Sequence, residues 1–499
     1  MPQAIDFGKL LSLFTYDKYD PLLFGSSLFL FFFLFVLLVQ RLFSSQKALR
    51  IYSLLFFSLF FYYKAAGIYL LLLVFSSVFN FYFGKLIFKS KTAALKKLFF
   101  VAALVVNLGL LGYFKYTNFF LQIISDLKLG TIEPLQIFLP IGISFFTFKA
   151  LSYVIEIYLE MLEPVKSLRD FSLFIFFFPN VLMGPIDRAS EFLPQIEEDN
   201  PITKEDVGRA LFLISCGLIK KYAIADYISL NFNERVFGFP LRFTGVENLI
   251  AVYSAALQGY CDFSGYTDMA LGVGLLLGYK LMDNFNRPFK AVSVGDYWRR
   301  WHLSLSTWLL GYLFKPLQIS FRAMRKWGTA LAIFITFFAV GLWHGPNWTF
   351  IFFGVLHSVF LIFGMFTQSI RKKFTDSIKI TGTKFHNFIK VIFTFHLLVF
   401  TAILFHAPSL SYALDMIQQI FTYFHPEVFP QFVQAYTTVF VLIVFGYLVH
   451  FLPKSVEVKA QSIVINMPVV LQAVLFAVVI WIVVQFKSAE MMPFIYFQF

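Results

Sequence analysis

Cysteine and charge are both scarce in this sequence. Its 499 residues include two cysteines, Cys216 and Cys261, and each lies in an apolar stretch. Two such cysteines exclude the disulfide framework of a small secreted domain and a cysteine-rich metal site. Charged residues form 14% of the chain, against about 25% in soluble domains. A chain this poor in charge is neither intrinsically disordered nor a typical soluble enzyme.

Apolar and aromatic residues dominate instead. Hydrophobic residues make up 59% of the chain, and 71 residues are phenylalanine, 24 tyrosine and 7 tryptophan. The mean hydropathy is +0.74. Aromatic side chains in such numbers suit contact with lipid and with the membrane–water interface. The composition therefore predicts an integral membrane protein.

Basic residues exceed acidic ones by 41 to 28, which gives a net charge of +13. In a membrane protein, the positive-inside rule and anionic inner-leaflet lipid favour lysine and arginine in short cytoplasmic loops. Residues 85–97 contain five lysines and no acidic residue, as such a loop would. We therefore expect these basic residues to contact membrane lipid and not nucleic acid.

The apolar runs predict a multi-pass topology. Residues 22–39 match one helical crossing of a membrane core about 30 Å thick. The basic stretches at 41–50 and 85–97 are both expected to be cytoplasmic, so the segment between them should cross twice, hinged near Lys64. This arrangement predicts an N-terminus on the outer side.

Several later apolar segments are too short or too polar to cross a membrane alone. Irregular backbone at membrane depth is tolerated only where it is buried in protein or lines a wet cavity, so these segments indicate a site inside the bundle. Residues 329–343 would form only ~22 Å of helix before a break at Gly345-Pro346. This break predicts that His344 stands at a helix terminus beside an internal cavity. The acidic stretch 187–206 is expected to be a solvated connection.

Polar residues gather in apolar surroundings between residues 258 and 344. Asp262 and Asp268 are flanked by apolar sequence, and a carboxylate in lipid costs roughly 2.5–3.5 kcal/mol on insertion scales. These carboxylates must therefore face inward or form ion pairs. They could line a substrate tunnel, or they could only hold the bundle together by pairing with arginines, namely Arg287, Arg299 or Arg300. The other tunnel-lining candidates of this region are Ser264, Tyr266, Asn284 and Asn286.

The next stretch combines two arginines, three tryptophans and a histidine. On a helix Trp298 and His302 would share one face, and Arg299 and Ser306 the neighbouring one. Two adjacent arginines, Arg299 and Arg300, could hold phosphate oxygens or a carbonyl beside a cavity. The alternative is an interfacial anchor belt, although a belt has no need of His302.

His302 and His344 are the candidates for acid–base chemistry. The unperturbed pKa of histidine is near 6.5, so the neutral imidazole can accept a proton, and burial favours this neutral form. The sequence has no nucleophile elbow, metalloprotease helix, P-loop or dinucleotide-binding fingerprint. Two histidines without suitably spaced carboxylates give little case for a metal, and we expect none. His357, His396 and His450 lie in apolar segments and are expected to be satisfied core residues.

Two motifs resemble the histidine signatures of membrane-bound O-acyltransferases. They are WRRWHLSLSTW at 298–308 and GLWHG at 341–345. The resemblance is greatest to the bacterial branch that includes the membrane subunits of alginate O-acetylation and teichoic acid D-alanylation. Further stretches similar to motifs of this branch follow in order, from about residue 178 to 357; they lie at 178–186, 262–270 and 284–289.

The chain departs from this branch in one region. The branch usually has Phe-Arg-Asp after the first histidine motif and a Gly-Gly-Asn-Arg turn soon afterwards. This chain has Leu309-Leu310-Gly311 and then Ile319-Ser320-Phe321-Arg322. The donor or partner contacts of those family residues therefore do not transfer to this chain.

The resemblance implies an all-α, polytopic transmembrane bundle with short, tilted and re-entrant helices around a central funnel or tunnel. It implies one integral membrane domain over residues 1–499, with the motif-bearing core at 178–357 and peripheral helices at 1–177 and 358–499. The expected location is the bacterial cytoplasmic (inner) membrane.

The activity that the resemblance implies is O-acyl transfer, most simply of acetyl. The donor would be a cytoplasmic thioester, acetyl-CoA or an acyl carrier protein, and no tightly bound cofactor is expected. The acceptor would be a hydroxyl of a cell-envelope polysaccharide or of a secreted or membrane partner acyltransferase on the outer side. His344 matches the principal catalytic histidine, with His302 nearby.

The hypothesis for the mechanism is that neutral His344 takes the proton of the acceptor hydroxyl as it attacks the thioester carbonyl. Asn347 or one of the two adjacent arginines could stabilise the oxyanion. Trp308 and Trp343 complete the candidates for the tunnel lining. Two other classes stay open: a transporter or channel that uses the polar residues as a solute path, and a structural subunit that docks a secreted partner.

Overall fold

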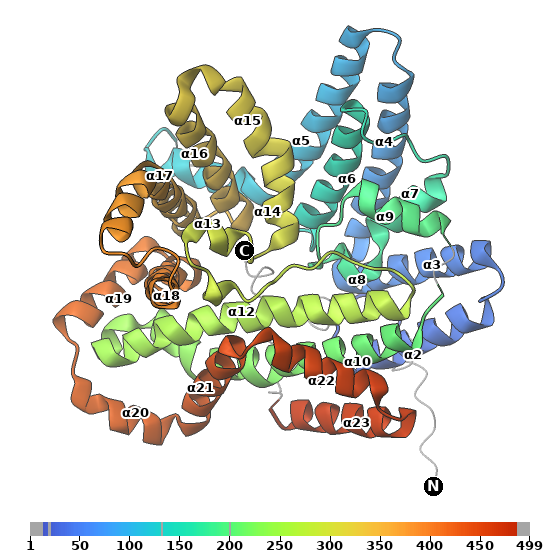
Figure 1. Cartoon of the computed structure of the whole chain (residues 1–499). Helices are drawn as coiled ribbons and strands as arrows, with labels where there is room; N and C mark the ends of the chain where they lie inside the picture. Colours follow the sequence, from blue (N-terminus) through green and yellow to red (C-terminus); the bar gives the residue numbers. More distant parts are fainter. Residues whose placement is uncertain (1–12, 18–20, 131–132, 199–200, 487–499) are drawn as a thin grey trace. The chain divides into compact units, whose positions relative to one another are not determined.

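The computed structural model describes residues 13–17, 21–130, 133–198 and 201–486. Within these ranges the chain is helical, and the β-type pairing is one isolated antiparallel bridge between Phe285 and Trp301. The all-α prediction is confirmed for the described part of the chain (Figure 1).

The chain forms two compact units. The first contains the residues up to Ala210 together with Ala270–Met282, and the second contains Leu211–Met269 and the residues from Asp283 onward. The boundaries fall inside two helices, α10 (Lys204–Leu218) and α12 (Gly245–Leu276). The expectation of one domain over residues 1–499 stays a prediction.

The remaining helices belong to one unit each. Those of the first unit are α2 (Ser27–Leu42), α3 (Lys47–Ala66), α4 (Leu70–Lys89), α5 (Ala93–Asp126), α6 (Ile143–Tyr158), α7 (Leu168–Phe176), α8 (Phe178–Val181) and α9 (Ala189–Glu197). Those of the second unit are α11 (Glu234–Gly238), α13 (Val294–Trp298), α14 (Leu303–Leu309), α15 (Lys315–Ser320), α16 (Arg325–His344), α17 (Trp348–Ser377), α18 (Lys384–His406), α19 (Leu410–Thr422), α20 (Phe429–Ala435), α21 (Thr437–Phe451), α22 (Lys454–Asn466) and α23 (Val469–Phe486).

Several helices are long and apolar enough to cross a membrane. Among the described residues there are six, or seven when α20 and α21, bent by 99°, count as one broken span. Only 17% of the most apolar stretch of α5 is buried in protein, so its apolar side chains face outward, as lipid contact requires. The multi-pass prediction is confirmed, and the bent pair agrees with the expectation of re-entrant helices.

The first apolar run forms a helix that begins later than the run itself. This helix, α2, begins at Ser27 because the Ser26 side chain caps it, accepting from Phe29 N at 3.1 Å. Lys47–Lys89 counts as one candidate span of 43 residues, about twice the length of one crossing. It is interrupted at Gly67, whose φ of +58° is left-handed, close to the hinge predicted near Lys64. The number of crossings in this segment and the outer position of the N-terminus, which lies outside the described residues, stay predictions.

The helix that carries His344 is longer than its apolar run indicated. α16 spans 20 residues and belongs to the candidate spans, so the expectation of a segment too short to cross was wrong. It begins at Arg325, whose φ of +53° separates it from the preceding turn. Basic residues in the first turn do not stop a helix, because backbone capping and not hydrophobicity decides where it starts. The predicted end at His344 is confirmed.

Glycines allow α16 and α17 to pack closely. A Cβ at Gly354 would lie 2.2 Å from Phe337 O, and a Cβ at Gly341 would lie 2.5 Å from Phe350 O. Both distances are shorter than a side-chain carbon tolerates against backbone. This close contact brings the end of α16, with His344, against the first turns of α17.

We expect Gly354→Ala to destabilise the protein by about 1–3 kcal/mol, because the added methyl overpacks the contact between α16 and α17. Thermal unfolding of the purified protein in detergent measures the effect. Gly364→Ala on the same helix is the matched control, because the nearest atom to its Cβ is the flexible Arg371 Nη2 at 3.9 Å. Equal unfolding temperatures for the two variants would contradict the close packing.

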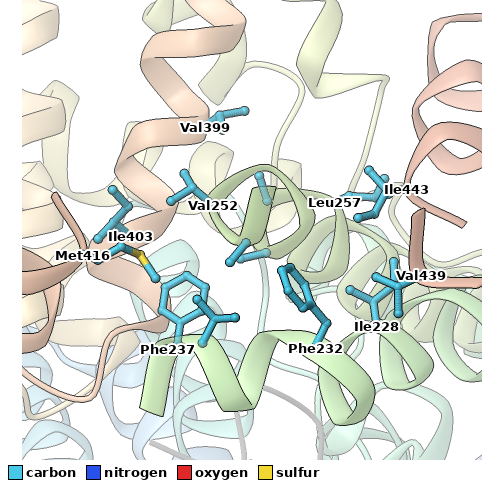
Figure 2. Packing of buried hydrophobic residues seen from close by; sticks show 14 of the residues in the cluster. Ile228, Phe232, Phe237, Val252, Leu257, Val399, Ile403, Met416, Val439 and Ile443 are labelled. Carbon is cyan, nitrogen blue, oxygen red and sulfur yellow. The ribbon is translucent and has the colours of Figure 1, made fainter. Parts of the chain in front are cut away.

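The second unit has a hydrophobic core centred on α12. Val252 and Leu257 of this helix pack with Val399 and Ile403 of α18. Figure 2 shows these side chains together with residues from the flanking helices, namely Ile228, Phe232, Phe237, Met416, Val439 and Ile443. This core holds α12 and α18 side by side, and the candidate site lies along the same two helices.

Candidate functional site

His344 lies in an aromatic box at the C-terminus of α16. Its side chain is buried, with 1% of the residue exposed. The imidazole contacts the rings of Phe405, Trp343 and Phe353 at centroid distances of 5.0, 5.2 and 5.8 Å. It lines a cavity of about 50 Å³ within the second unit. The sequence-based expectation that His344 stands at a helix end beside an internal cavity is confirmed.

The lining of this cavity, which we call the His344 cavity, is mostly apolar. Its residues come from α12, α13, α16, α17, α18 and the loops beside α13. They are Ala255, Ala256, Gly259, Phe289, Tyr297, Trp301, His344, Phe353, Leu398, Thr401, Ala402, Phe405 and His406. Of the predicted site residues, only His344 is among them.

His302 also contacts the Trp343 ring. The His302 and Trp343 rings are 5.4 Å apart, against 5.2 Å between Trp343 and His344, so one indole contacts both imidazoles. The structure therefore brings the two predicted histidines to one place. Trp343 is itself buried, and its role in lining a tunnel stays a prediction.

Asn284 fixes the orientation of the His302 ring. The Asn284 Oδ1 lies 3.3 Å from His302 Nδ1 and also accepts from Ser304 Oγ at 2.6 Å. A carbonyl oxygen only accepts, so Nδ1 is the donor in this contact and carries the hydrogen. Burial lowers the pKa of His302 to about 3, which keeps the ring neutral. Its Nε2 is therefore the proton-accepting nitrogen.

The backbone of His302 is left-handed, with φ of +47°. A non-glycine residue pays about 1–2 kcal/mol for this conformation. The break also shows that residues 298–308 do not form one helix: α13 ends at Trp298 and α14 begins at Leu303. The prediction that Trp298 and His302 share a helix face was wrong, because Trp301 instead pairs with Phe285 in the isolated bridge.

Trp298 forms a hydrogen bond with a third buried histidine, His357. Its Nε1 donates to His357 Nδ1 at 3.1 Å, and His357 Nε2 lies 3.3 Å from Thr401 Oγ1. Because Nδ1 accepts, Nε2 carries the hydrogen and donates to the threonine. Both nitrogens of His357 are thus satisfied, as expected of a core histidine. Trp298 acts as a structural donor in this arrangement, and Thr401 connects it to the wall of the His344 cavity.

The two adjacent arginines pair with Asp296, not with the predicted aspartates. Arg300 Nε lies 3.0 Å from Asp296 Oδ2, and Arg299 Nη2 lies 3.7 Å from Asp296 Oδ1 with 74% of its side chain exposed. Arg300 Nη1 also donates to the backbone oxygen of Asn286, at 3.4 Å. Neither arginine lines the His344 cavity. Their roles toward phosphate or an oxyanion remain predictions.

Three further candidates have local structural partners. The Asn347 side chain caps α17, accepting from Thr349 N at 3.0 Å, and its amide nitrogen donates to Pro408 O at 3.0 Å. Ser306 Oγ donates to Trp301 O at 3.1 Å. Trp308 packs against Tyr312 at 5.0 Å. Asn347 thus fixes the turn after His344, and an oxyanion role for it stays untested.

Asp262 and Asp268 form ion pairs with lysines. Asp262 Oδ1 lies 2.6 Å from Lys221 Nζ, and Asp268 Oδ2 lies 2.7 Å from Lys220 Nζ. The alternative in which arginines pair with these aspartates is wrong, because Arg287 pairs with Glu457 at 2.6 Å and the two adjacent arginines pair with Asp296. Adjacent lysines on the π-helical segment Ile219–Asp226 reach carboxylates six residues apart on α12. Ser264 and Tyr266 are buried on the same stretch.

Close helix packing makes these ion pairs possible. A Cβ at Gly217 would lie 2.5 Å from Gly265 O, and a Cβ at Gly265 would lie 2.8 Å from Gly217 O. Glycine at both positions lets the end of α10 cross α12 at backbone contact. The lysines that follow Gly217 therefore meet the aspartates on either side of Gly265. This ion-pair cluster does not line the His344 cavity.

Three other histidines of the apolar segments lie in different surroundings. His450 is buried, and its Nε2 accepts from Phe289 N at 3.2 Å, as expected of a core residue. His396 is exposed, so its placement in the core was wrong. His406, which the sequence reasoning passed over, lines the His344 cavity. Its only signal in the sequence is its position before Pro408 at the end of an apolar run.

The first unit holds a buried polar network that the sequence also failed to reveal. Lys149 Nζ donates to Asn180 Oδ1 at 2.8 Å, and Asn180 Nδ2 donates to Asp187 Oδ2 at 2.5 Å. Asp187 Oδ1 also accepts from Met282 N at 2.9 Å. The prediction that residues 187–206 form a solvated connection is therefore wrong for the start of this segment. There Asp187 is buried, and α9 begins two residues later.

No metal centre is evident in the described ranges, where no three His, Cys, Asp or Glu side chains come close enough to hold an ion.

Comparison with known proteins agrees with the motifs. Residues 164–410 match the model of the MBOAT, membrane-bound O-acyltransferase, family. The chain is 33% identical to the peptidoglycan O-acetyltransferase of Helicobacter pylori over 70% of this chain and 69% of that protein. It is 34% identical to the probable alginate O-acetylase AlgI of Pseudomonas aeruginosa, over 81% and 75% of the two chains. It is 30% identical to the teichoic acid D-alanyltransferase of Bacillus subtilis, over 52% and 67%.

The names of these relatives refer to three different polymers. The match covers both His302 and His344, and the structure places these two histidines around one tryptophan inside a helical membrane protein. The chain therefore belongs to the membrane-bound O-acyltransferase family and is a multi-pass membrane O-acyltransferase.

Proposed function

We propose that the chain transfers an acyl group, acetyl in the simplest case, from a cytoplasmic thioester to a hydroxyl of a cell-envelope polymer. The acceptor is either the polysaccharide itself or a partner protein that passes the group onward. The observation that carries this proposal is the buried imidazole of His344 at the end of a spanning helix, on the wall of a cavity. The names of the relatives, which act on peptidoglycan, alginate and teichoic acid, support the polymer class.

In this proposal His344 is the general base. It takes the proton of the acceptor hydroxyl while the hydroxyl oxygen attacks the thioester carbonyl carbon. The carbon–sulfur bond then breaks, and the imidazolium returns the proton to the leaving thiolate. The products are an oxygen ester and a free thiol, so no acyl-enzyme is needed.

His302 acts as a positioning residue in this scheme. It contacts the indole that also packs against His344, and Asn284 fixes its ring orientation. The aromatic walls around His344 exclude bulk water, which protects the thioester from hydrolysis. The donor is acetyl-CoA or an acyl carrier protein, bound only as a co-substrate.

Mass spectrometry of cell-envelope polymers tests the proposal. We expect ester-linked acyl groups to be lost when the protein is removed from its native bacterium, and to return with the intact chain. Unchanged ester content after removal would contradict the proposal. Isotope-labelled acetate fed to the cells distinguishes acetyl from other acyl groups, because the label appears in the released ester only for acetyl.

A further inference from the structure

His406 is a second imidazole on the wall of the His344 cavity. It is the last residue of α18. The ring of Phe405 contacts both histidines, 5.0 Å from the His344 ring and 5.9 Å from the His406 ring. The proposed mechanism assigns no role to His406.

The hydrogen bonding of His406 fixes which nitrogen can accept a proton. Its Nδ1 lies 3.1 Å from Ala402 O, one helical turn earlier. A backbone carbonyl has no hydrogen to give, so Nδ1 is the donor, and the neutral ring carries its lone pair on Nε2. Nε2 is buried and has no hydrogen-bond partner among the described residues. A buried acceptor without a partner loses the hydrogen bonds that water would give it, and a hydrogen-bond donor on a ligand would restore one of them.

Small residues leave the space beside His406. Ala255, Ala256 and Gly259 of α12 and Ala402 of α18 line the same cavity. A Cβ at Gly259 would lie 3.5 Å from His406 Cε1 and 3.8 Å from Nε2. An engineered apolar cavity of about 150 Å³ binds benzene, so the roughly 50 Å³ of the His344 cavity has room for part of an acceptor residue and not for a whole ring.

We propose that His406 is a positioning residue for the acceptor, and that its Nε2 accepts a hydrogen bond from a second hydroxyl of the same acceptor residue that is acylated at His344. The acceptor site therefore selects a polyol, such as a sugar or an alditol, over an alcohol with one hydroxyl. This inference rests on the proposed function and specifies its substrate class. A hydroxyl carries one hydrogen, so the two imidazoles need two hydroxyls.

Two alcohols of equal carbon number test the proposal on the full-length protein in lipid nanodiscs. The donor probe is radiolabelled acetyl-CoA, and the acceptors are glycerol, with three hydroxyls, and propan-1-ol, with one. We expect kcat/KM for glycerol to exceed that for propan-1-ol at least ten-fold, because a site built to bind a hydroxyl discriminates strongly against its absence.

Two variants remove the contact in different ways. His406→Phe keeps a ring but lacks the acceptor nitrogen, and Gly259→Ala places a methyl group against Nε2 at an ordinary van der Waals distance, so it is expected to fold. Both variants should bring the ratio of the two alcohols close to one, mainly through a higher KM for glycerol. His406→Gln offers an acceptor oxygen and should restore part of the preference.

Three results would overturn the inference. The first is a glycerol to propan-1-ol ratio of kcat/KM near one in the unmodified protein, and the second is a ratio that neither variant changes. The third is an equal fall in kcat/KM for both alcohols in a folded His406→Phe protein. Failure of the proposed function looks different. In that case no alcohol is esterified by the unmodified protein, and its removal from cells leaves the envelope esters unchanged.

Discussion

Replacement of His344 by glutamine is expected to lower acyl transfer by about 10²–10⁴-fold. Glutamine fills a similar volume and can hydrogen-bond, but it cannot take a proton from a hydroxyl. Because the side chain is buried among aromatic rings, the variant should keep the fold while losing the base. Transfer from labelled acetyl-CoA in membranes, normalised to the amount of protein, measures the effect.

His396→Gln is the matched control for this experiment. His396 also lies in an apolar helix, but it is exposed and its Nδ1 contacts Ile392 O of its own helix at 2.8 Å. We expect this variant to retain full transfer. If His344→Gln kept the activity of the unmodified protein, His344 would not be the base. Substrate flux that survived the loss of both His344 and His302 would favour a transporter.

Replacement of Lys221 by methionine is expected to cost about 3–5 kcal/mol of stability. Lys221 Nζ lies 2.6 Å from Asp262 and 2.8 Å from Asp226, and 7% of the lysine side chain is exposed. Its removal takes the common cation away from the buried carboxylate of Asp262 and the half-buried carboxylate of Asp226, and a desolvated charge that loses its counter-ion is expensive. Thermal unfolding of the purified protein in detergent checks this expectation.

A compensated variant separates charge from packing. Lys221→Met combined with Asp226→Leu and Asp262→Leu removes all three charges, and buried ion pairs replaced by apolar residues are often neutral or stabilising. We therefore expect this triple variant to recover most of the lost stability. Arg299→Ala is the surface control and should change stability by less than about 0.5 kcal/mol, because 74% of the Arg299 side chain is exposed. An unfolding temperature unchanged by Lys221→Met would refute a structural role for this cluster.

The local sequence predicted that the aspartates of α12 need neutralising groups, but it did not predict which residues supply them. Asp262 and Asp268 had to be neutralised, because carboxylates in apolar surroundings are costly. The cations came from Lys220 and Lys221, more than forty residues away in sequence. The pairing depends on the glycine contact between α10 and α12, which is a tertiary feature. The same holds for Asp187, which looked solvated in sequence and is buried in the fold.

Helix ends were predictable only where a break was strong. Gly345-Pro346 ends α16 at His344 as expected. The start of the same helix was missed, because arginine and lysine are compatible with a first helical turn. The stretch 298–308 looked helical throughout, but its strand-like pairing with Phe285 interrupts it and turns His302 left-handed.

The sequence by itself determined that this is an integral membrane protein, that its fold is all-α, and that His302 and His344 lie in the histidine motifs of its family. These features follow from composition and from short motifs, which a linear chain displays directly. Only the tertiary structure decided that both histidines contact Trp343 and that His406 lines the same cavity as His344. Such contacts join residues from several helices, and helix packing sets them through side-chain volume and close glycine contacts that no local pattern encodes.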